Sequence, residues 1–170
     1  MFFTLEHFYT QAEERLNSFN DFIKSNAIEE KIFPDHFGYR CSTNEEFINL
    51  RAFFEFEASF VYQSIIAKRR IALIKLKIPL ATLAGPLMYL ELSDQKLDGS
   101  QKSGFDHVEF FSRTKDIQTL LTLFESKKYL FTKIERPHHI TFDCRLADGL
   151  VVRIEEEALI QKIVTKEICP

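Results

Sequence analysis

Two Asp-His pairs stand at the start of two strand-like stretches, P-D-H-F-G-Y-R-C and G-F-D-H-V-E-F-F. A glutamate follows each pair near the end of a later apolar run: Glu91 lies 55 residues after His36, and Glu155 lies 48 residues after His107. The shared order and similar spacing indicate one supersecondary unit that is built twice. Two imidazoles and two carboxylates form a ligand set for a single divalent metal ion. The sequence therefore predicts a metal centre at His36, Glu91, His107 and Glu155.

Nitrogen and carboxylate donors suit Zn, Ni, Fe, Mn or Co and do not choose between these metals. Fewer than six protein ligands leave coordination positions for water or substrate, as a catalytic centre requires. Arg40 and Arg153 fall on the predicted inward strand faces, where a guanidinium suits a substrate carboxylate or enolate. A glutamate that the metal does not hold tightly, Glu155 or Glu91, is expected to act as the general base.

Plainer readings compete with this hypothesis. Asp35 and Asp106 are either hydrogen-bond partners of the two histidines or residues of the strand entry, because strand alternation turns neighbouring side chains to opposite faces. Arg40 with Glu109, or Arg153 with Glu91, are candidate cross-strand ion pairs, and an acidic run such as 155–157 is favoured at a helix start by the dipole alone. The remaining histidines and Cys41 are assigned no role in the site; His138 and His139 lie in a predicted strand and His7 in a predicted helix.

The elements that must position these residues follow the same order in each unit. Alternating apolar residues predict strands, and polar caps before acidic residues predict helices. The first unit, residues 34–93, is expected to contain strand 35–41, a helix to about residue 55, strands 60–67 and 71–78, a loop over 79–86 and strand 87–92. The second unit, residues 104–158, is expected to contain strand 105–112, helix 114–127 and strands 129–135, 138–145 and 150–155.

Segments outside the two units complete the predicted domain of residues 1–170. Apolar residues at helical spacing over 4–26 predict an amphipathic helix, or a broken pair of helices, within an N-terminal segment of residues 1–33. Since the second unit lacks a counterpart, this segment is expected to pack on one unit only. Residues 94–104 form the linker, helical spacing returns over 156–167, and residues 159–170 form a C-terminal tail. The fold class is α+β, with two βαβββ modules forming a curved mixed-sheet cleft.

Composition limits the range of partners. The net charge of −3 and the scattered basic residues argue against a nucleic-acid or anionic-membrane binder. Three cysteines without a C-x-x-C pair indicate neither a disulfide framework nor a thiolate zinc site, which fits a cytoplasmic protein. Neither a signal peptide nor a membrane span is expected. The expected partner is a small-molecule substrate or ligand, bound by a monomer or a homodimer.

The four segments P-D-H-F-G-Y-R-C, Y-L-E-L, G-F-D-H-V-E-F-F and I-E-E-E-A-L resemble the YecM family of bacterial proteins. More widely, the arrangement looks like the vicinal oxygen chelate superfamily, which includes glyoxalase I, extradiol dioxygenases and bleomycin-resistance proteins. The resemblance implies paired βαβββ modules around a cleft, a helical N-terminal segment and metal ligands from the first and last strands of each module. Carried over position by position, it implies His36 and Glu91 from the first module and His107 and Glu155 from the second.

Three hypotheses about function remain open at this point. The first is a metal-dependent enzyme, an isomerase, lyase or oxidoreductase, that acts on a small substrate through two adjacent oxygens. The second is a non-catalytic metal-binding or small-ligand-binding protein. The third is a scaffold whose added helix docks a partner and whose polar face is only salt-bridged.

Overall fold

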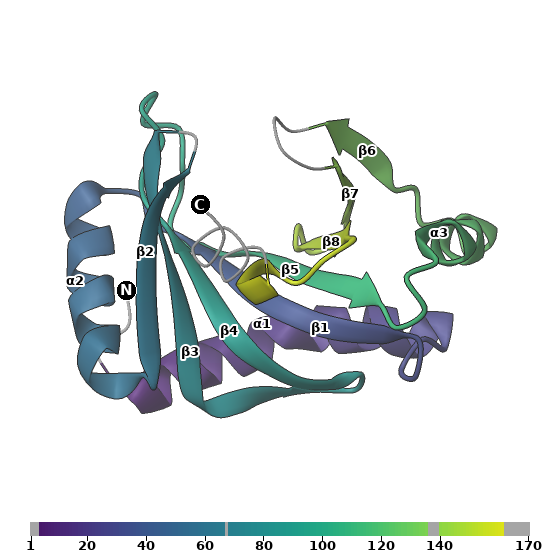
Figure 1. Ribbon diagram of the computed structural model, residues 1–170, viewed down its shortest axis with the longest axis horizontal. Coiled ribbons are helices and arrows are strands. Elements are labelled where there is room, and N and C mark those ends of the chain that lie inside the picture. The colour runs from purple at the N-terminus through teal and green to yellow at the C-terminus, as the bar shows by residue number, and fades with distance from the viewer. Residues whose placement is uncertain (1–3, 67, 136–139, 162–170) are drawn as a thin grey trace.

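The protein is built around one eight-stranded mixed sheet with the strand order β2-β3-β4-β1-β5-β8-β7-β6, seen in a computed structural model that describes residues 4–66, 68–135 and 140–161. Figure 1 shows the sheet curving so that β2 and β6 face each other across it, with α1 running along its outer side. The elements are α1 (Leu5–Asn26), β1 (Ile32–Arg40), α2 (Asn44–Glu57), β2 (Phe60–Ile66), β3 (Arg69–Thr82), β4 (Gly85–Ser93), β5 (Gly104–Ser112), α3 (Ile117–Ser126), β6 (Thr132–Glu135), β7 (Ile140–Arg145) and β8 (Val151–Glu155).

The two predicted βαβββ modules are confirmed, and their first strands join them. β1 pairs in parallel with β4, the last strand of its own module, and β5 pairs in parallel with β8 in the same way. Between the modules β1 and β5 run antiparallel. The four strands that carry the predicted ligands are therefore neighbours at the middle of the sheet.

The predicted loop over residues 79–86 is wrong, because β3 continues through its first half to Thr82 and β4 begins at Gly85. The pairing of β3 with β4 is interrupted after Lys75 and resumes with Leu80 opposite Leu87. Pro79 falls inside that interruption, where a missing backbone N–H costs no ladder hydrogen bond. The two strands thus form a long hairpin.

Several other boundaries differ slightly from the sequence expectation. β6 begins at Thr132 rather than at residue 129, and β7 is described from Ile140 onward. The predicted C-terminal helix over 156–167 is described only as far as residue 161, where residues 159–161 are helical. The rest of that prediction lies outside the described residues.

The N-terminal helix is one continuous helix, and it packs on both modules, so the expectation that it covers one module is wrong. Thr4 caps its start by accepting a hydrogen bond from the His7 N–H at 3.1 Å. In the first module, the Tyr9 hydroxyl donates to the Ile78 carbonyl at 2.6 Å. In the second, Arg15 forms an ion pair with Asp148.

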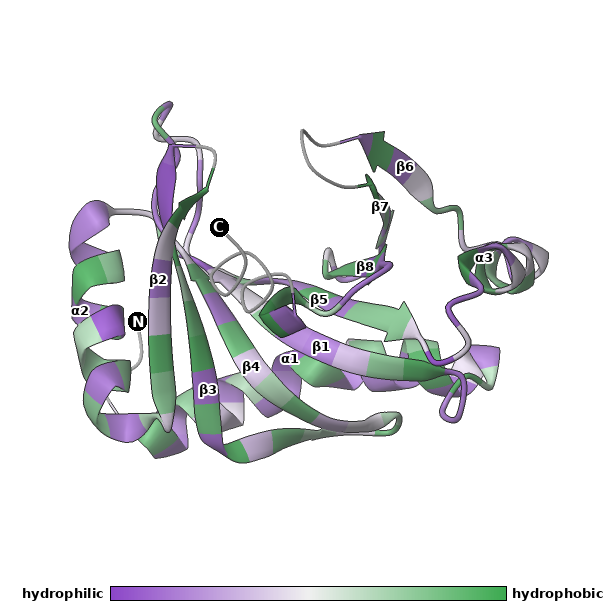
Figure 2. Ribbon diagram, viewed as in Figure 1, coloured by the Kyte–Doolittle hydropathy of each residue, from purple (hydrophilic) through white to green (hydrophobic). Residues whose placement is uncertain are grey.

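Helix packing confines the main core to one face of the sheet. Phe8 of α1 lies between Phe54 of α2 and Phe105 of β5, with ring centroids 5.1 and 6.0 Å away. Phe22 of α1 likewise contacts Phe110 of β5 and Phe124 of α3. Figure 2 shows polar residues interspersed among apolar ones along β2 and β4, whereas β3 carries a buried apolar run over residues 71–74. The opposite, concave face carries polar side chains together with buried apolar ones such as Leu73, the β3 partner of Glu91.

None of the helices among the described residues is long and apolar enough to cross a membrane.

Candidate metal centre

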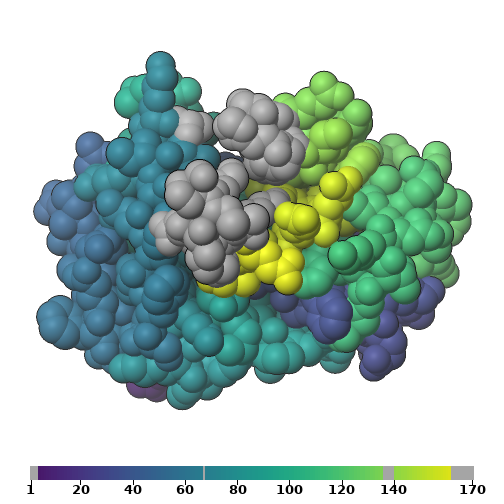
Figure 3. Space-filling view, in the orientation of Figure 1, coloured from purple at the N-terminus to yellow at the C-terminus, as the bar shows by residue number. Residues whose placement is uncertain are grey.

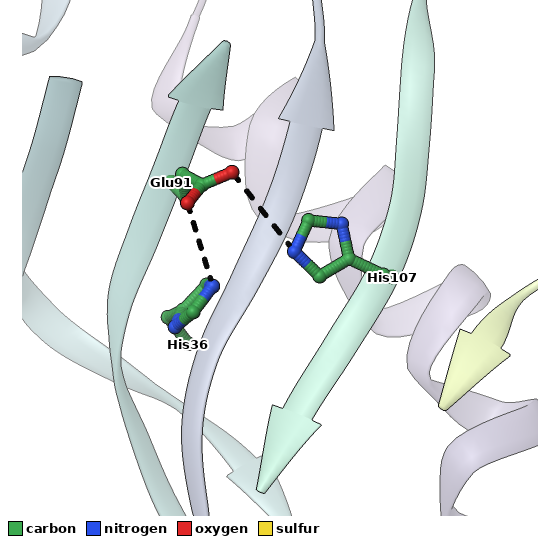
Figure 4. Close-up of side chains that lie close together, drawn as sticks. All are labelled: His36, Glu91 and His107. Carbon is green, nitrogen blue, oxygen red and sulfur yellow. Dashed lines mark ion pairs between the residues drawn. The ribbon is translucent and has the colours of Figure 1, made fainter. Parts of the chain in front are cut away.

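Three predicted ligands meet on the concave face: His36 from β1, Glu91 from β4 and His107 from β5 (Figure 4). The two oxygens of Glu91 face one imidazole each: Oε2 lies 3.7 Å from His36 Nε2, and Oε1 lies 4.0 Å from His107 Nε2. The two imidazole rings are edge to face, with centroids 5.5 Å apart. Residues far apart in the chain are thus brought within reach of one ion.

Gly38 leaves the space in which these side chains converge. In the sheet register it lies opposite both Glu91 on β4 and His107 on β5. The His107 ring covers its α-carbon so closely that a Cβ added there would be 2.1 Å from His107 Cε1. Only a residue without a side chain allows the His107 ring to lean across β1 toward Glu91 and His36.

Asp35 and Asp106 each occupy an extra position in the ladder between β1 and β5. The pairing steps from Pro34 opposite Phe110 directly to His36 opposite Glu109, which leaves Asp35 unpaired. On β5, the pairing steps from His107 opposite Gly38 directly to Phe105 opposite Tyr39, which leaves Asp106 unpaired. Such a bulge breaks strict alternation and re-aims a side chain. Each aspartate can therefore share the face of the histidine that follows it.

Both bulged aspartates bind the outer nitrogen of their own histidine. Asp35 Oδ2 lies 2.9 Å from His36 Nδ1, and Asp106 Oδ2 lies 3.2 Å from His107 Nδ1. A carboxylate in this place holds the Nδ1 proton and turns the Nε2 lone pair inward, as in many histidine metal ligands. Of the two roles that the sequence left open, the hydrogen-bond role is the one observed.

Other parts of the chain anchor the two aspartates. Arg40 reaches across from β1 to Asp106 at 2.6 Å, so its observed partner is an aspartate rather than Glu109. Asp35 accepts a hydrogen bond of 2.9 Å from the Leu159 N–H. In Figure 3 the last described residues, in yellow, lie over the middle of this face between the first module, in blue and teal, and the second, in green. The hydrogen bond from Leu159 thus brings the segment after β8 into contact with Asp35.

Glu109 and Arg153 extend the centre toward the second module. Glu109 Oε2 lies 3.8 Å from His36 Nε2 and 3.7 Å from Arg153 Nη1. Arg153 also makes a two-pronged contact with Asp143, with Nε and Nη2 each donating at 2.8 Å. From the sequence, Glu109 is only a candidate ion-pair partner of Arg40. The signal that it belongs to the site is its pairing opposite His36, which sequence alone does not show.

Glu155 lies farther along the sheet than the other predicted ligands. It pairs with Phe111, whereas His107 pairs with Val151, four positions back along β8. Since a strand advances about 3.3 Å per residue, Glu155 is roughly 13 Å along the strand from the level of His107. Two groups of donors with ligand atoms within 4.8 Å of one another are present in the described chain: His36 with Glu91 and His107, and His36 with Asp35 and Glu109. Glu155 is in neither group.

The donor atoms fit a divalent metal ion. His36 Nε2 and His107 Nε2 are buried and lack a hydrogen-bond partner within the described chain, although such atoms normally have one. Their distances to Glu91 are too long for hydrogen bonds. Two ligands of one ion, with bonds of about 2.1 Å, lie roughly 3.0 to 3.6 Å apart. The two distances to Glu91, 3.7 and 4.0 Å, exceed that range by only a few tenths of an ångström.

Electrostatic effects in the site favour charged groups despite their burial. Burial disfavours the His36 imidazolium, but nearby carboxylates, first among them Glu109, outweigh it and raise the pKa of His36 to about 9. Burial likewise disfavours the Glu91 carboxylate, and the two histidines more than offset this, so the pKa of Glu91 is lowered. In the metal-free chain, His36 therefore carries a proton that a bound metal ion would replace.

The other candidates are kept apart from the centre. Cys41 is fully buried, and burial raises the pKa of its thiol, as expected for a packing residue rather than a nucleophile. His7 lies on α1, which packs against the opposite face of the sheet. His138 and His139 lie outside the described residues.

Comparisons with known proteins agree with this fold. The family model described as "YecM protein" matches residues 4–165. A solved structure described as "Structural Genomics, Protein EC4020" aligns with a TM-score of 0.65 and 18% identity, over 91% of this chain and 90% of that one. A methylmalonyl-CoA epimerase aligns with a TM-score of 0.49 and 10% identity, over 72% of this chain and 92% of that one. No curated protein matches the sequence. At these identities the structural matches concern the fold alone.

Proposed function

The chain belongs to the YecM family, and from that premise and its own side chains we propose that it binds one divalent metal ion through His36, Glu91 and His107. The observation that supports this proposal is the pair of buried Nε2 atoms that lack hydrogen-bond partners in the described chain and face the two oxygens of one carboxylate. Imidazole and carboxylate donors suit Zn, Ni, Fe, Mn or Co.

We further propose that the protein is a metal-dependent enzyme, an isomerase, lyase or oxidoreductase, for a small substrate that chelates through two adjacent oxygens. The metal would supply Lewis acidity, which stabilises negative charge on those oxygens. Asp35 and Asp106 hold the two imidazoles in the tautomer that directs Nε2 inward. Of the carboxylates, Glu109 lies beside His36 and is placed to accept a proton from a bound substrate. Arg153, next to Glu109, is placed to orient an anionic group.

Metal analysis tests the first part of the proposal. Protein purified without added metal is expected to contain about one ion per chain, and His107→Ala is expected to lose it because one of three donors is missing. His7→Ala is the matched control, since it removes a histidine from the other side of the sheet and should keep the metal. A chelator should lower the melting temperature of the wild type but not of His107→Ala, because a ligand of the native state stabilises it. Equal metal contents in wild type and His107→Ala would contradict the proposal.

Turnover separates an enzyme from a binding protein. Metal-replete protein should convert a member of the classes that offer two adjacent oxygens, namely 2-oxo-aldehydes, 2-hydroxy acids and catechols. Tight retention of such a compound without any product would instead favour the non-catalytic binding protein.

Metal affinity is expected to rise with pH up to about pH 9. The pKa of His36 in the metal-free chain is raised from 6.5 to about 9, and only neutral imidazole is a ligand, so binding below that pH displaces a proton. One displaced proton corresponds to about a tenfold gain in affinity per pH unit. The same raised pKa stabilises the metal-free fold: this contribution is complete below pH 6.5 and is lost as the pH rises through about 9. Competition with a chelating indicator from about pH 6.5 to about pH 8.5 measures the slope, and a constant affinity would contradict it.

A further inference from the structure

The internal repeat of the chain breaks at the fourth ligand position. In the first module, His36 pairs with Tyr89 on β4, and Glu91 lies two positions further along that strand. In the second module, His107 pairs with Val151 on β8, and Arg153 lies two positions further along that strand. The structural counterpart of Glu91 is thus a cation, and Glu155 lies two positions beyond it. A side chain that repels a metal ion stands where the symmetry of the fold would place a metal ligand.

A metal ion and Arg153 on the same side of the site require an anion between them. In the metal-free chain Glu109 fills that place, since a single oxygen, Oε2, lies 3.8 Å from His36 Nε2 and 3.7 Å from Arg153 Nη1. Neither distance is a hydrogen bond, so neither contact holds Glu109 firmly. An exogenous anion with better geometry can take the same place.

Arg153 is held ready for such an anion. Its Nε and Nη2 groups are fixed by Asp143 at 2.8 Å each, which sets the plane of the guanidinium. Its Nη1 group points to the other side, toward the Glu109 oxygen. The side chain is 14% exposed, so its charge is poorly screened by water. An arginine fixed on one edge by a carboxylate and only loosely contacted on the other is a preorganised binding group.

We propose that this centre has three protein ligands rather than four, and that its exogenous ligand is a small carboxylate with a second oxygen next to the acid, of the 2-oxo or 2-hydroxy acid class. Two vicinal oxygens of this ligand bind the metal, and its acid group replaces Glu109 as the partner of Arg153, while Glu109 stays beside His36. This inference rests on the proposed metal site. It assigns Arg153 to ligand selection and leaves Glu155 without a role in metal binding.

Spectra of cobalt(II)-loaded protein test the inference without a known substrate. Cobalt affinity is measured first, and Glu155→Gln should keep it within about threefold of the wild type because Glu155 is not a ligand. Two probes are then added: oxalate, which has carboxylate oxygens left over for Arg153, and acetohydroxamate, which chelates through two vicinal oxygens without an acid group. Ultrafiltration confirms that cobalt stays with the protein. Arg153→Gln should weaken oxalate binding at least tenfold, as expected for a lost charge-assisted hydrogen bond, and leave acetohydroxamate within about threefold.

Arg153→Lys keeps a positive charge beside Asp143 and covers the case in which Arg153→Gln fails to fold. It should bind cobalt normally and weaken oxalate at least about threefold, since an ammonium group cannot form the two-sided contact. Unchanged oxalate affinity in the folded Arg153 variants would overturn the inference, as would a more than tenfold loss of cobalt affinity in Glu155→Gln. Both of these results leave the proposed metal site standing. Wild-type protein that binds no cobalt would overturn the site and the inference together.

Discussion

Gly38→Ala is expected to abolish metal binding at this centre, with a loss of affinity of at least about a hundredfold. The new methyl group would lie 2.1 Å from His107 Cε1 and 2.7 Å from its Nε2, so the ring must leave its place. The loss should match that of His107→Ala because both changes remove the same donor. Calorimetric or indicator titration with a divalent metal measures the effect.

A double variant separates this clash from general damage to the sheet. Overpacking typically costs about 1 to 3 kcal/mol of unfolding free energy, and here the cost comes from the His107 ring. In a His107→Ala background the ring is absent, so adding Gly38→Ala should change the unfolding free energy by less than about 0.5 kcal/mol. A Gly38→Ala protein that binds metal as tightly as the wild type would show that the imidazole of His107 is not a ligand.

Phe22→Ala is expected to lower the free energy of unfolding by about 3 to 5 kcal/mol. Phe22 is 1% exposed, and its ring contacts Phe110, Phe124 and Tyr129 with centroid distances of 6.2, 5.1 and 5.0 Å. Removing the ring leaves a cavity where α1 joins the second module. Urea unfolding followed by circular dichroism measures the loss.

Phe56 offers the matched control for this prediction. It is also a helical phenylalanine but is 81% exposed, so Phe56→Ala should stay within about 0.5 kcal/mol of the wild type. Since α1 packs on both modules, the unfolding of Phe22→Ala should remain a single transition. Two separate transitions would mean that the modules fold independently and that α1 does not couple them.

Local patterns were enough to predict the architecture. Each Asp-His pair opens a strand whose alternation is readable from the sequence, and each is followed by a helix with a capping residue, Thr43 or Asp116. Repetition of this order twice allowed the modules, and the meeting of His36 with His107, to be expected without coordinates. α1 was also readable as a helix, but the position of its packing surface was not, because an apolar stripe does not name its partner.

The details of the site depend on strand register, which the sequence does not reveal. Asp35 and Asp106 reach their histidines only because each falls on a bulge, and a bulge has no pattern of its own in alternating residues. The similar His-to-Glu separation in the two modules led to Glu155, whereas the pairing of β5 with β8 puts Arg153 in the corresponding place. A shift of two residues keeps a side chain on the same face, so alternation alone cannot distinguish these two positions.

The antiparallel pairing of β1 with β5 has a consequence for how the centre responds to protein concentration. Because these adjacent strands of one polypeptide supply both imidazoles and β4 of the same polypeptide supplies Glu91, no second copy of the chain is needed to assemble the three donors. Dilution from micromolar to nanomolar protein should therefore leave the metal dissociation constant unchanged.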